Sequence, residues 1–329
     1  MDVALMYEAF YGLREKPFSI LPDPDYLYLG KRHALAYSML EYGVEHRAGF
    51  TVVTGGIGCG KTTLIRHLLN QLDNDVTVGL ISNTQQDIGE LLKWVLLAFG
   101  QPYENMDRVA LFDRLNQFLI EQYAAGKRTV LIIDEAQNLA GGTLEELRML
   151  SNINADKDLL LQLVLVGQPE LMDLLRRPEL EQFVQRVSAD FHLPALGLDE
   201  VPDYINHRLV VAGREAMLFD DGAMARIAEV SEAVPRKINT LCDTALVYAF
   251  SQEAEIVTAG IVDEVLQDKA RYGVLRETAP VTGEAEPRGP AVEEFADRPE
   301  PTKVRKVRDN TSLDIDTARQ LFSNLADKN

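Results

Sequence analysis

The sequence predicts an α/β protein, with a parallel sheet covered by helices on both faces, then a small all-helical lid domain and a disordered tail. Three observations lead to this prediction. Short apolar runs alternate with segments of helical periodicity between residues 49 and 197. A glycine-rich loop joins the first apolar run to the first helical segment. The strand pattern stops at residue 198, and from residue 275 the chain is rich in Pro, Glu and Ala with few large apolar residues.

The strands of the first domain are expected to be short, apolar and buried. They cover 50–54, 76–81, 129–133, 161–166 and 189–193, with helices at about 62–72, 87–99, 107–124, 143–152, 169–175 and 179–184. Asp87–Glu90 and Thr143–Glu146 each place a capping oxygen three residues before an acid, which is a helix-start signal. Trp94 is expected in the core. Such an alternation favours parallel strands, whose carboxyl ends form the ligand-binding edge.

The chain is expected to divide into four parts. Residues 1–48 form a segment and a helix beside the site of the glycine-rich loop, 49–197 the sheet domain, 198–274 the helical domain and 275–329 the tail. Helices of the second domain are expected at about 199–212, 220–231, 235–252 and 257–271, and Pro235 suits a first helical turn. The tail carries a basic cluster at 303–308 and a terminal apolar stripe, which is either a docking peptide or a tail helix without a role.

Composition limits the function classes. The 329 residues carry a formal net charge of −18, which disfavours a free-standing nucleic-acid-binding protein. Two cysteines provide no disulfide framework, no apolar run is long enough to cross a bilayer, and the N-terminus lacks the basic region of a signal peptide. We therefore expect a cytoplasmic protein that reaches the inner membrane only through a partner.

Residues 55–62 read G-G-I-G-C-G-K-T, the pattern of a phosphate-binding loop between a strand and a helix. Glycines let the backbone N–H groups converge on a phosphate chain, and the helix start adds its positive end. Lys61 is expected to reach the β- and γ-phosphates of ATP, and the Thr62 hydroxyl to sit on Mg²⁺. The predicted nucleotide-binding residues are Gly55, Gly56, Ile57, Gly58, Cys59, Gly60, Lys61, Thr62, Thr63 and Arg236.

Acidic and amide side chains follow later strands of the same sheet. Asp134 and Glu135 end an apolar strand; Asp134 is expected to hold Mg²⁺ through water and Glu135 to activate the attacking water. Gln168 follows the next strand, where it either touches the γ-phosphate or the water, or caps the following helix.

Arginines provide two further candidates. Arg186 precedes the last strand, where it is a candidate finger for a neighbouring subunit's γ-phosphate, with Arg176 and Arg177 as rivals and a surface arginine as the alternative. Arg236 begins a helix of the second domain and is expected to reach the phosphates of its own subunit, which would couple the nucleotide to the angle between domains.

The cysteine of the phosphate loop permits two interpretations. Cys59 is either a small filler or an oxidisable thiol whose pKa is lowered by the helix start. Cys242 is expected in the core, and the five histidines show no metal-ligand spacing.

Eight further segments of the chain carry recognisable motifs. They are Met6–Leu13, Lys16–Phe18, Pro22–Pro24, Tyr26–Leu29, Asp134–Leu139, Glu146–Asn152, Gly167–Leu171 and Pro235–Asn239. These motifs resemble those of the AAA+ ATPases known as general secretion pathway protein A, and the resemblance covers about residues 6–274. In particular, the chain resembles the short secretion ATPases associated with exosortase (PEP-CTERM) and exopolysaccharide loci, and a related short form is linked to pilus biogenesis.

This resemblance implies an AAA+ core with a helical lid and ATP-dependent oligomers. It assigns Lys61 and Thr62 to the Walker A motif and Asp134 and Glu135 to the Walker B motif. It also assigns Gln168 to sensor 1 and Arg236 to sensor 2. It also implies that the segment from Phe18 to Tyr28 lines the adenine pocket. The secretion-pathway members continue into a membrane helix and a peptidoglycan-binding domain, whereas this chain continues into an acidic tail, so direct cell-wall binding is not expected.

The sequence therefore predicts a Mg-dependent ATPase. Its cycle would drive a conformational change in an envelope or inner-membrane assembly partner of a secretion, exopolysaccharide or pilus system. The first alternative is a DNA-associated ATPase of the transposition-regulator kind, which the acidic charge disfavours. The second is a small-molecule kinase, against which the Asp134–Glu135 pair indicates water as the acceptor.

Overall fold

The computed structural model describes residues 6–46, 49–73, 75–82, 91–155 and 158–272, all within one compact unit that spans residues 1–277. The helix-start signal expected at 87–90, the basic cluster at 303–308 and the terminal apolar stripe lie outside the described residues. Within the described part of the chain, no helix has both the length and the apolar character that a bilayer span requires.

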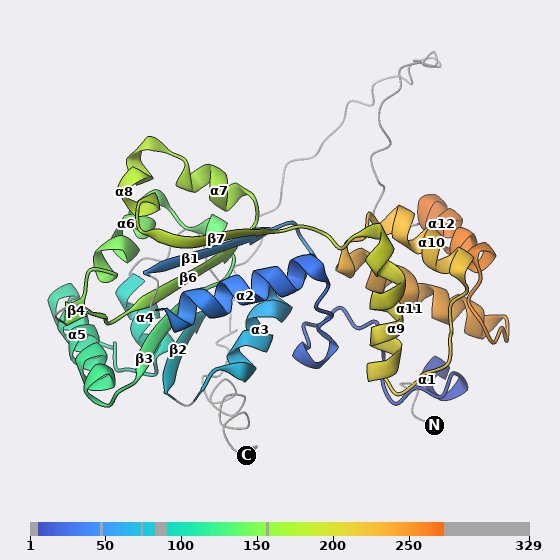
Figure 1. The fold of residues 1–329 in the computed structure, drawn as a ribbon, viewed down its shortest axis with the longest axis horizontal. Coiled ribbons are helices and arrows are strands. Elements are labelled where there is room, and N and C mark those ends of the chain that lie inside the picture. Colours follow the sequence, from blue (N-terminus) through green and yellow to red (C-terminus); the bar gives the residue numbers. More distant parts are fainter. Residues whose placement is uncertain (1–5, 47–48, 74, 83–90, 156–157, 273–329) are drawn as a thin grey trace, which may run out of the picture. The chain divides into compact units, whose positions relative to one another are not determined.

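A five-stranded parallel sheet forms the centre of the first domain (Figure 1). Its order is β2-β3-β6-β1-β7. The strands are β1 (Phe50–Gly55), β2 (Val76–Ile81), β3 (Arg128–Ile133), β6 (Gln162–Gly167) and β7 (Val187–Leu193). All six residues of β1 and of β6 are buried, because these strands have a neighbour on each side and helices on each face.

Helices cover both faces of this sheet, as the sequence predicts. Alternate residues of a strand point to opposite faces, and in β3 Val130 and Ile132 join one hydrophobic core while Leu131 and Ile133 join the other. The core with Val130 and Ile132 includes side chains of α2 (Lys31–Glu45) and α3 (Lys61–Gln71). The core with Leu131 and Ile133 includes side chains of α4 (Leu91–Ala98), α5 (Arg108–Ala124), α6 (Gly141–Leu150), α7 (Glu170–Leu175) and α8 (Glu181–Val184).

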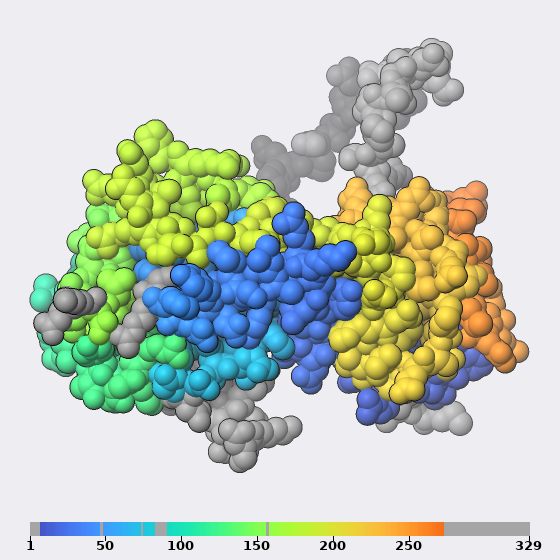
Figure 2. All heavy atoms as spheres, in the orientation of Figure 1, coloured from blue at the N-terminus to red at the C-terminus, as the bar shows by residue number. Residues whose placement is uncertain are grey.

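A separate hydrophobic core organises the helical lid. It contains α9 (Val201–Val211), α10 (Asp221–Ser231), α11 (Pro235–Ser251) and α12 (Ala259–Tyr272). The N-terminal residues Tyr7, Tyr11 and Phe18 are buried in the same core, and α1 (Met6–Phe10) packs on α11. Figure 2 shows the N-terminal part of the chain, in blue, between the green sheet domain and the yellow and orange lid on this face.

Short elements complete the connections. They are the 3₁₀ turns η2 (Pro24–Tyr26), η3 (Ala136–Asn138), η4 (Pro178–Leu180) and η5 (Leu198–Glu200), and a small antiparallel pair, β4 (Asn154–Ala155) with β5 (Asp158–Leu159).

Two local predictions are wrong. Trp94 is 42% exposed, because the buried face of α4 is formed by Leu91, Leu92, Val95 and Leu96, and Trp94 lies on the other face. The helix expected to begin with a Thr143 cap begins two residues earlier, with Ala140 as its N-cap and without a side-chain cap. The N-cap at Asp107 and the first-turn proline at Pro235 do match the expected helices.

The close approach of α2 to the sheet gives a first testable prediction. A Cβ on Gly43 of α2 would overlap the Thr51 hydroxyl of β1. Gly43→Ala is therefore expected to lower the free energy of unfolding by about 1–3 kcal/mol, although alanine favours the helix. Gly142→Ala is the control, because a Cβ on that exposed residue of α6 meets nothing within 4 Å. Chemical denaturation measures both variants, and a Gly43→Ala protein as stable as Gly142→Ala would contradict the packing described here.

Candidate functional site

The phosphate loop lies between β1 and α3, where the sequence predicts it. Gly58 and Gly60 adopt φ values of +79° and +96°, a left-handed conformation that favours glycine. Gly60 is the N-cap of α3, so the loop leads directly into the positive end of an 11-residue helix. Left-handed glycines before a helix start are the features that let backbone N–H groups bind an anion.

Lys61 is buried at the base of this loop, with 7% of its surface exposed. Its ammonium donates hydrogen bonds to the carbonyls of Gly55 and Gly56, at 2.8 Å and 3.0 Å. An ammonium has three donors, so these two contacts hold the charge in place and leave one donor for a further acceptor. The position is that expected for a lysine that grips a phosphate.

Cys59 is buried in the same loop, and burial raises the pKa of its thiol. Its side chain lies in the hydrophobic core shared by α2 and α3, which favours a small filler over a thiol activated by a lowered pKa. His33 of α2 supports the loop from outside, since its Nε2 lies 2.9 Å from the Cys59 carbonyl oxygen. Burial lowers the pKa of His33, so the neutral ring donates to that carbonyl.

Thr62 and Asp134 come together at the first turn of α3 and the end of β3. The Thr62 hydroxyl donates to Asp134 Oδ2 at 3.0 Å, and burial raises the pKa of the Asp134 carboxyl. Mg²⁺ takes oxygen ligands and keeps several waters, so one hydroxyl and one carboxylate beside a phosphate loop suit this ion. These two residues fit the magnesium site that the sequence predicts.

Glu135 and Gln168 also meet, although they follow different strands. Gln168 Nε2 donates to Glu135 Oε2 at 3.2 Å. The Gln168 side chain does not cap α7, whose N-cap is Pro169 without a side-chain cap. Both residues line the same pocket as Lys61 and Thr62, so the amide belongs to the site and the capping alternative is wrong.

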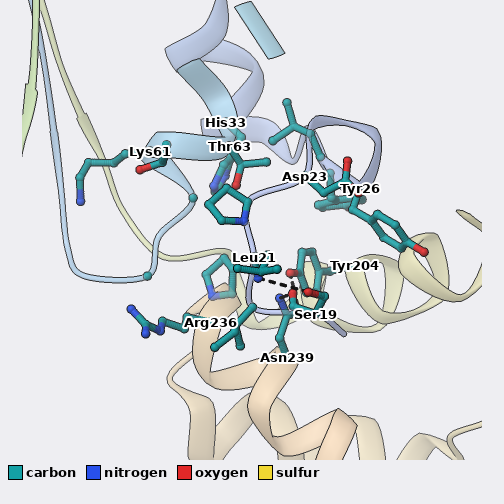
Figure 3. A pocket seen from close by; sticks show the side chains of 18 of the residues that line it. Ser19, Leu21, Asp23, Tyr26, His33, Lys61, Thr63, Tyr204, Arg236 and Asn239 are labelled. Atoms are coloured by element: carbon teal, nitrogen blue, oxygen red, sulfur yellow. Dashed lines mark hydrogen bonds between the residues drawn. The ribbon is translucent and has the colours of Figure 1, made fainter. Parts of the chain in front are cut away.

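Three parts of the chain build the walls of this pocket (Figure 3). The phosphate loop and the start of α3 form one wall, and the N-terminal segment from Ser19 to Tyr28 forms the second. The third comes from the lid, through Tyr204 and Arg208 of α9 and Pro235, Arg236 and Asn239 of α11. The N-terminal segment that the resemblance assigns to an adenine pocket therefore borders the phosphate loop.

Arg236 lies directly against the phosphate loop. Its backbone N–H donates to the Gly58 carbonyl at 3.2 Å, and a Cβ on Gly58 would be 2.6 Å from the Arg236 Cβ. The absence of a side chain at position 58 thus lets the first turn of the lid helix reach the loop. This contact brings Arg236 to the pocket, as the sequence predicts.

A clamp between the lid and the N-terminal segment escaped the sequence analysis. Arg208 is buried and donates to the carbonyls of Pro17 and Ser19, at 2.5 Å and 3.4 Å, and its guanidinium lies 4.6 Å from the Tyr26 ring centre. Tyr204 donates to Asn239 Oδ1 at 2.8 Å, and the Asn239 amide reaches the Ser19 carbonyl. Figure 3 shows Ser19, Tyr204 and Asn239 linked at the pocket wall.

The other arginines lie apart from the pocket lining. Arg186 is exposed, and one of its guanidinium nitrogens lies 3.5 Å from the Ser151 hydroxyl. Arg176 is also exposed and pairs with Asp173. Neither these residues nor Arg177 are among the described residues around the pocket, so within one chain the structure does not bring the candidate fingers to the site.

Comparison with known proteins agrees with this geometry. Residues 44–175 match the AAA domain family. The chain is 42% identical over 256 residues to general secretion pathway protein A of Aeromonas hydrophila, across 78% of this chain and 47% of that protein. The chain thus spans about half the length of this curated relative.

Solved structures share the fold at low sequence identity. Aeropyrum pernix ORC2, in its ADPNP–ADP complexes, has a TM-score of 0.60 at 16% identity, covering 77% of this chain and 71% of that one. Cdc6p of Pyrobaculum aerophilum has a TM-score of 0.55 at 18% identity, covering 73% and 67%.

The parallel sheet, the phosphate loop and the domain match define the class: this is an AAA protein with the P-loop NTPase fold. Within that class, the matched part of the chain is similar to general secretion pathway protein A.

The Arg208 clamp gives a second prediction. Arg208→Met leaves the Pro17 carbonyl without its donor and the Ser19 carbonyl with Asn239 alone, and is expected to cost about 1–3 kcal/mol of unfolding free energy. Because Ser19 and Arg208 both line the pocket, the affinity for ATP is expected to fall as well. Arg226→Met is the control, since that arginine of α10 is 38% exposed and pairs with Asp263. Thermal melts and calorimetric titration measure the two effects, and an Arg208→Met protein that matches the control in both would refute the clamp.

Proposed function

We propose that this protein binds and hydrolyses Mg-ATP in the pocket between the phosphate loop, the N-terminal segment and the lid. The observation that carries the proposal is the convergence of Lys61, the Thr62–Asp134 pair and the Glu135–Gln168 pair at the carboxyl edge of the parallel strands. One ammonium, a pair of oxygen ligands and a carboxylate are the groups that phosphoryl transfer to water requires.

Each group has a distinct task in this proposal. The loop amides and Lys61 bind the phosphates. Two donors of the Lys61 ammonium already bind the Gly55 and Gly56 carbonyls, so the third donor binds a phosphate oxygen. Thr62 and Asp134 hold Mg²⁺, which when bound neutralises charge on the phosphates. Glu135 orients the attacking water and accepts its proton, and Gln168 contacts the γ-phosphate from beside Glu135.

Arg236 links the nucleotide to the lid. Arg236 lies in the first turn of α11 and contacts Gly58 of the phosphate loop. The lid helix therefore lies beside the loop that is proposed to bind the γ-phosphate. Loss of that phosphate on hydrolysis removes an anion from beside Arg236 and from the first turn of α3. The lid therefore has different contacts in the ATP and ADP states, which is the condition for a nucleotide-driven movement.

The energy is proposed to serve the assembly of an envelope system, such as a secretion, exopolysaccharide or pilus system, through a protein partner at the inner membrane. The similarity to general secretion pathway protein A supports this assignment. The protein is proposed to act from the cytoplasm as an ATP-dependent homo-oligomer. In that oligomer the exposed Arg186 reaches the γ-phosphate of a neighbouring subunit.

The DNA-associated alternative has less support. The net charge of −18 opposes binding to a polyanion, and the secretion-type relative matches this chain at 42% identity. Aeropyrum pernix ORC1, which was solved in complex with DNA, shares only 18% identity and therefore only the fold. Salt-dependent binding of duplex DNA by the purified protein would bring this alternative back.

The nucleotide site yields a third prediction, which separates binding from chemistry. Lys61→Ala removes the phosphate-binding ammonium and is expected to weaken ATP binding by at least about tenfold, since a charged hydrogen bond is worth roughly 1.5–3 kcal/mol. Glu135→Gln keeps the pocket and is expected to bind ATP normally while turnover falls by about 10²–10⁴-fold. Equilibrium binding and phosphate release measure the two effects.

Lys127→Ala is the control for this pair, because Lys127 is an exposed lysine just before β3. Normal ATP affinity in Lys61→Ala would exclude the phosphate loop as the binding site. Normal turnover in Glu135→Gln would exclude Glu135 as the base and leave the binding site intact.

The proposed finger yields a fourth prediction. Arg186→Ala is expected to bind ATP and hydrolyse it slowly, and mixing it with Glu135→Gln subunits is expected to restore part of the rate. In the mixture, an intact Arg186 from one subunit faces an intact Glu135 in the next. Arg176→Ala and Arg177→Ala serve as matched controls. Slow hydrolysis without any rescue in the mixture would remove Arg186 from the role of a trans-acting finger.

A further inference from the structure

The carboxylate of Glu135 accepts hydrogen bonds from two amide groups. Gln137 Nε2 donates to Glu135 Oε2 at 2.6 Å, and Gln168 Nε2 donates to the same oxygen at 3.2 Å. The shorter contact thus comes from Gln137, a residue that neither the motif pattern nor the resemblance assigns to the site. Hydrogen bonds to an ionised carboxylate are shorter and stronger than those between neutral groups.

Gln137 uses both ends of its amide. While its nitrogen donates to Glu135, its oxygen accepts the backbone N–H of Gln168 at 2.9 Å. One side chain therefore ties the carboxylate after β3 to the backbone after β6. Because an amide carries donor and acceptor on one planar group, both contacts together fix its orientation.

The backbone around Glu135 is shaped for this contact. Glu135 has φ +54° and ψ +36°, a left-handed conformation that is rare for a residue with a side chain. The chain then enters η3, which carries Gln137 back toward the end of β6. Such a conformation persists only where surrounding contacts hold it, and the Gln137 amide is one of these contacts.

Gly167 leaves the space that the Gln137 amide occupies. It is the last residue of β6, and a Cβ there would lie 2.8 Å from Gln137 Oε1. A methyl group at position 167 would push the amide away, and it would also lie 3.0 Å from Leu171 Cδ2. The chain thus offers two independent positions at which the same contact can be broken.

We propose that Gln137 is a positioning residue that holds the Glu135 carboxylate in place for proton abstraction from water. The proposal rests on the proposed role of Glu135 as the base. Glu135 and Gln168 are among the described residues that line the nucleotide pocket, and Gln137 is not, so Gln137 acts through its neighbours and does not touch the nucleotide. Without it, the carboxylate loses the shorter of these two hydrogen bonds and its link to the Gln168 backbone.

The test separates turnover from binding. Gln137→Ala is expected to lower kcat by about 10- to 100-fold, the effect of a misplaced catalytic group, with the Kd for ATP unchanged. Gln137→Glu is expected to lose at least as much, because an ionised carboxylate cannot donate to Glu135. Gly167→Ala is expected to reproduce the loss in kcat. Asn138→Ala is the control, since Asn138 is the exposed neighbour of Gln137 in η3.

A double-mutant comparison distinguishes positioning from a general structural role. If Gln137 acts only through the Glu135 carboxylate, Gln137→Ala adds no further loss to single-turnover hydrolysis in the Glu135→Gln protein. A structural role would multiply the two losses. Measured ATP binding shows that each variant is folded, and Gly167→Ala replaces Gln137→Ala if the latter does not bind ATP.

Two results would overturn the proposal: a kcat in Gln137→Ala equal to or above that of the unmodified protein, or a full additional loss in the Glu135→Gln background. Failure of the underlying function looks different, because Glu135→Gln by itself would then hydrolyse ATP at the normal rate.

Discussion

The site depends on one buried positive charge at the end of a strand. The Lys61 ammonium is held by the Gly55 and Gly56 carbonyls, and a buried charge without such partners would cost several kcal/mol. That requirement ties the loop to β1, which lies inside the sheet, and to α3, which covers one face of it. The sheet and the helices on its faces thus hold the loop in the conformation that phosphate binding requires.

Around this loop the molecule adds groups from distant parts of the chain. The lid helix α11 touches Gly58 through Arg236, and the Arg208 clamp fixes the N-terminal segment to α9. Glu135, Gln168 and Gln137 form a hydrogen-bonded group at the ends of two adjacent strands. Nucleotide binding, lid position and water activation are therefore proposed to depend on connected contacts around one pocket.

Local signals were sufficient for most of the fold and for the phosphate loop. The strand, loop and helix around Lys61 are contiguous, so their chemistry can be read from eight residues. The Arg208 clamp could not be predicted, because Arg208 binds Pro17 across 191 positions and no local pattern marks either end. Trp94 was misplaced because α4 is apolar on more than one face, and periodicity alone does not choose which face is buried. Gln137 was overlooked since its role depends on a turn that brings it beside β6.

Amide hydrogen exchange with and without Mg-ATP tests the central claim most directly, since it reports on all three pocket walls at once. The account predicts slower exchange in the phosphate loop at 56–63, in the N-terminal segment at 19–28 and at the start of α11 at 236–239. Protection confined to the phosphate loop would contradict a pocket closed by the N-terminal segment and the lid. The absence of protection at all three would contradict nucleotide binding itself.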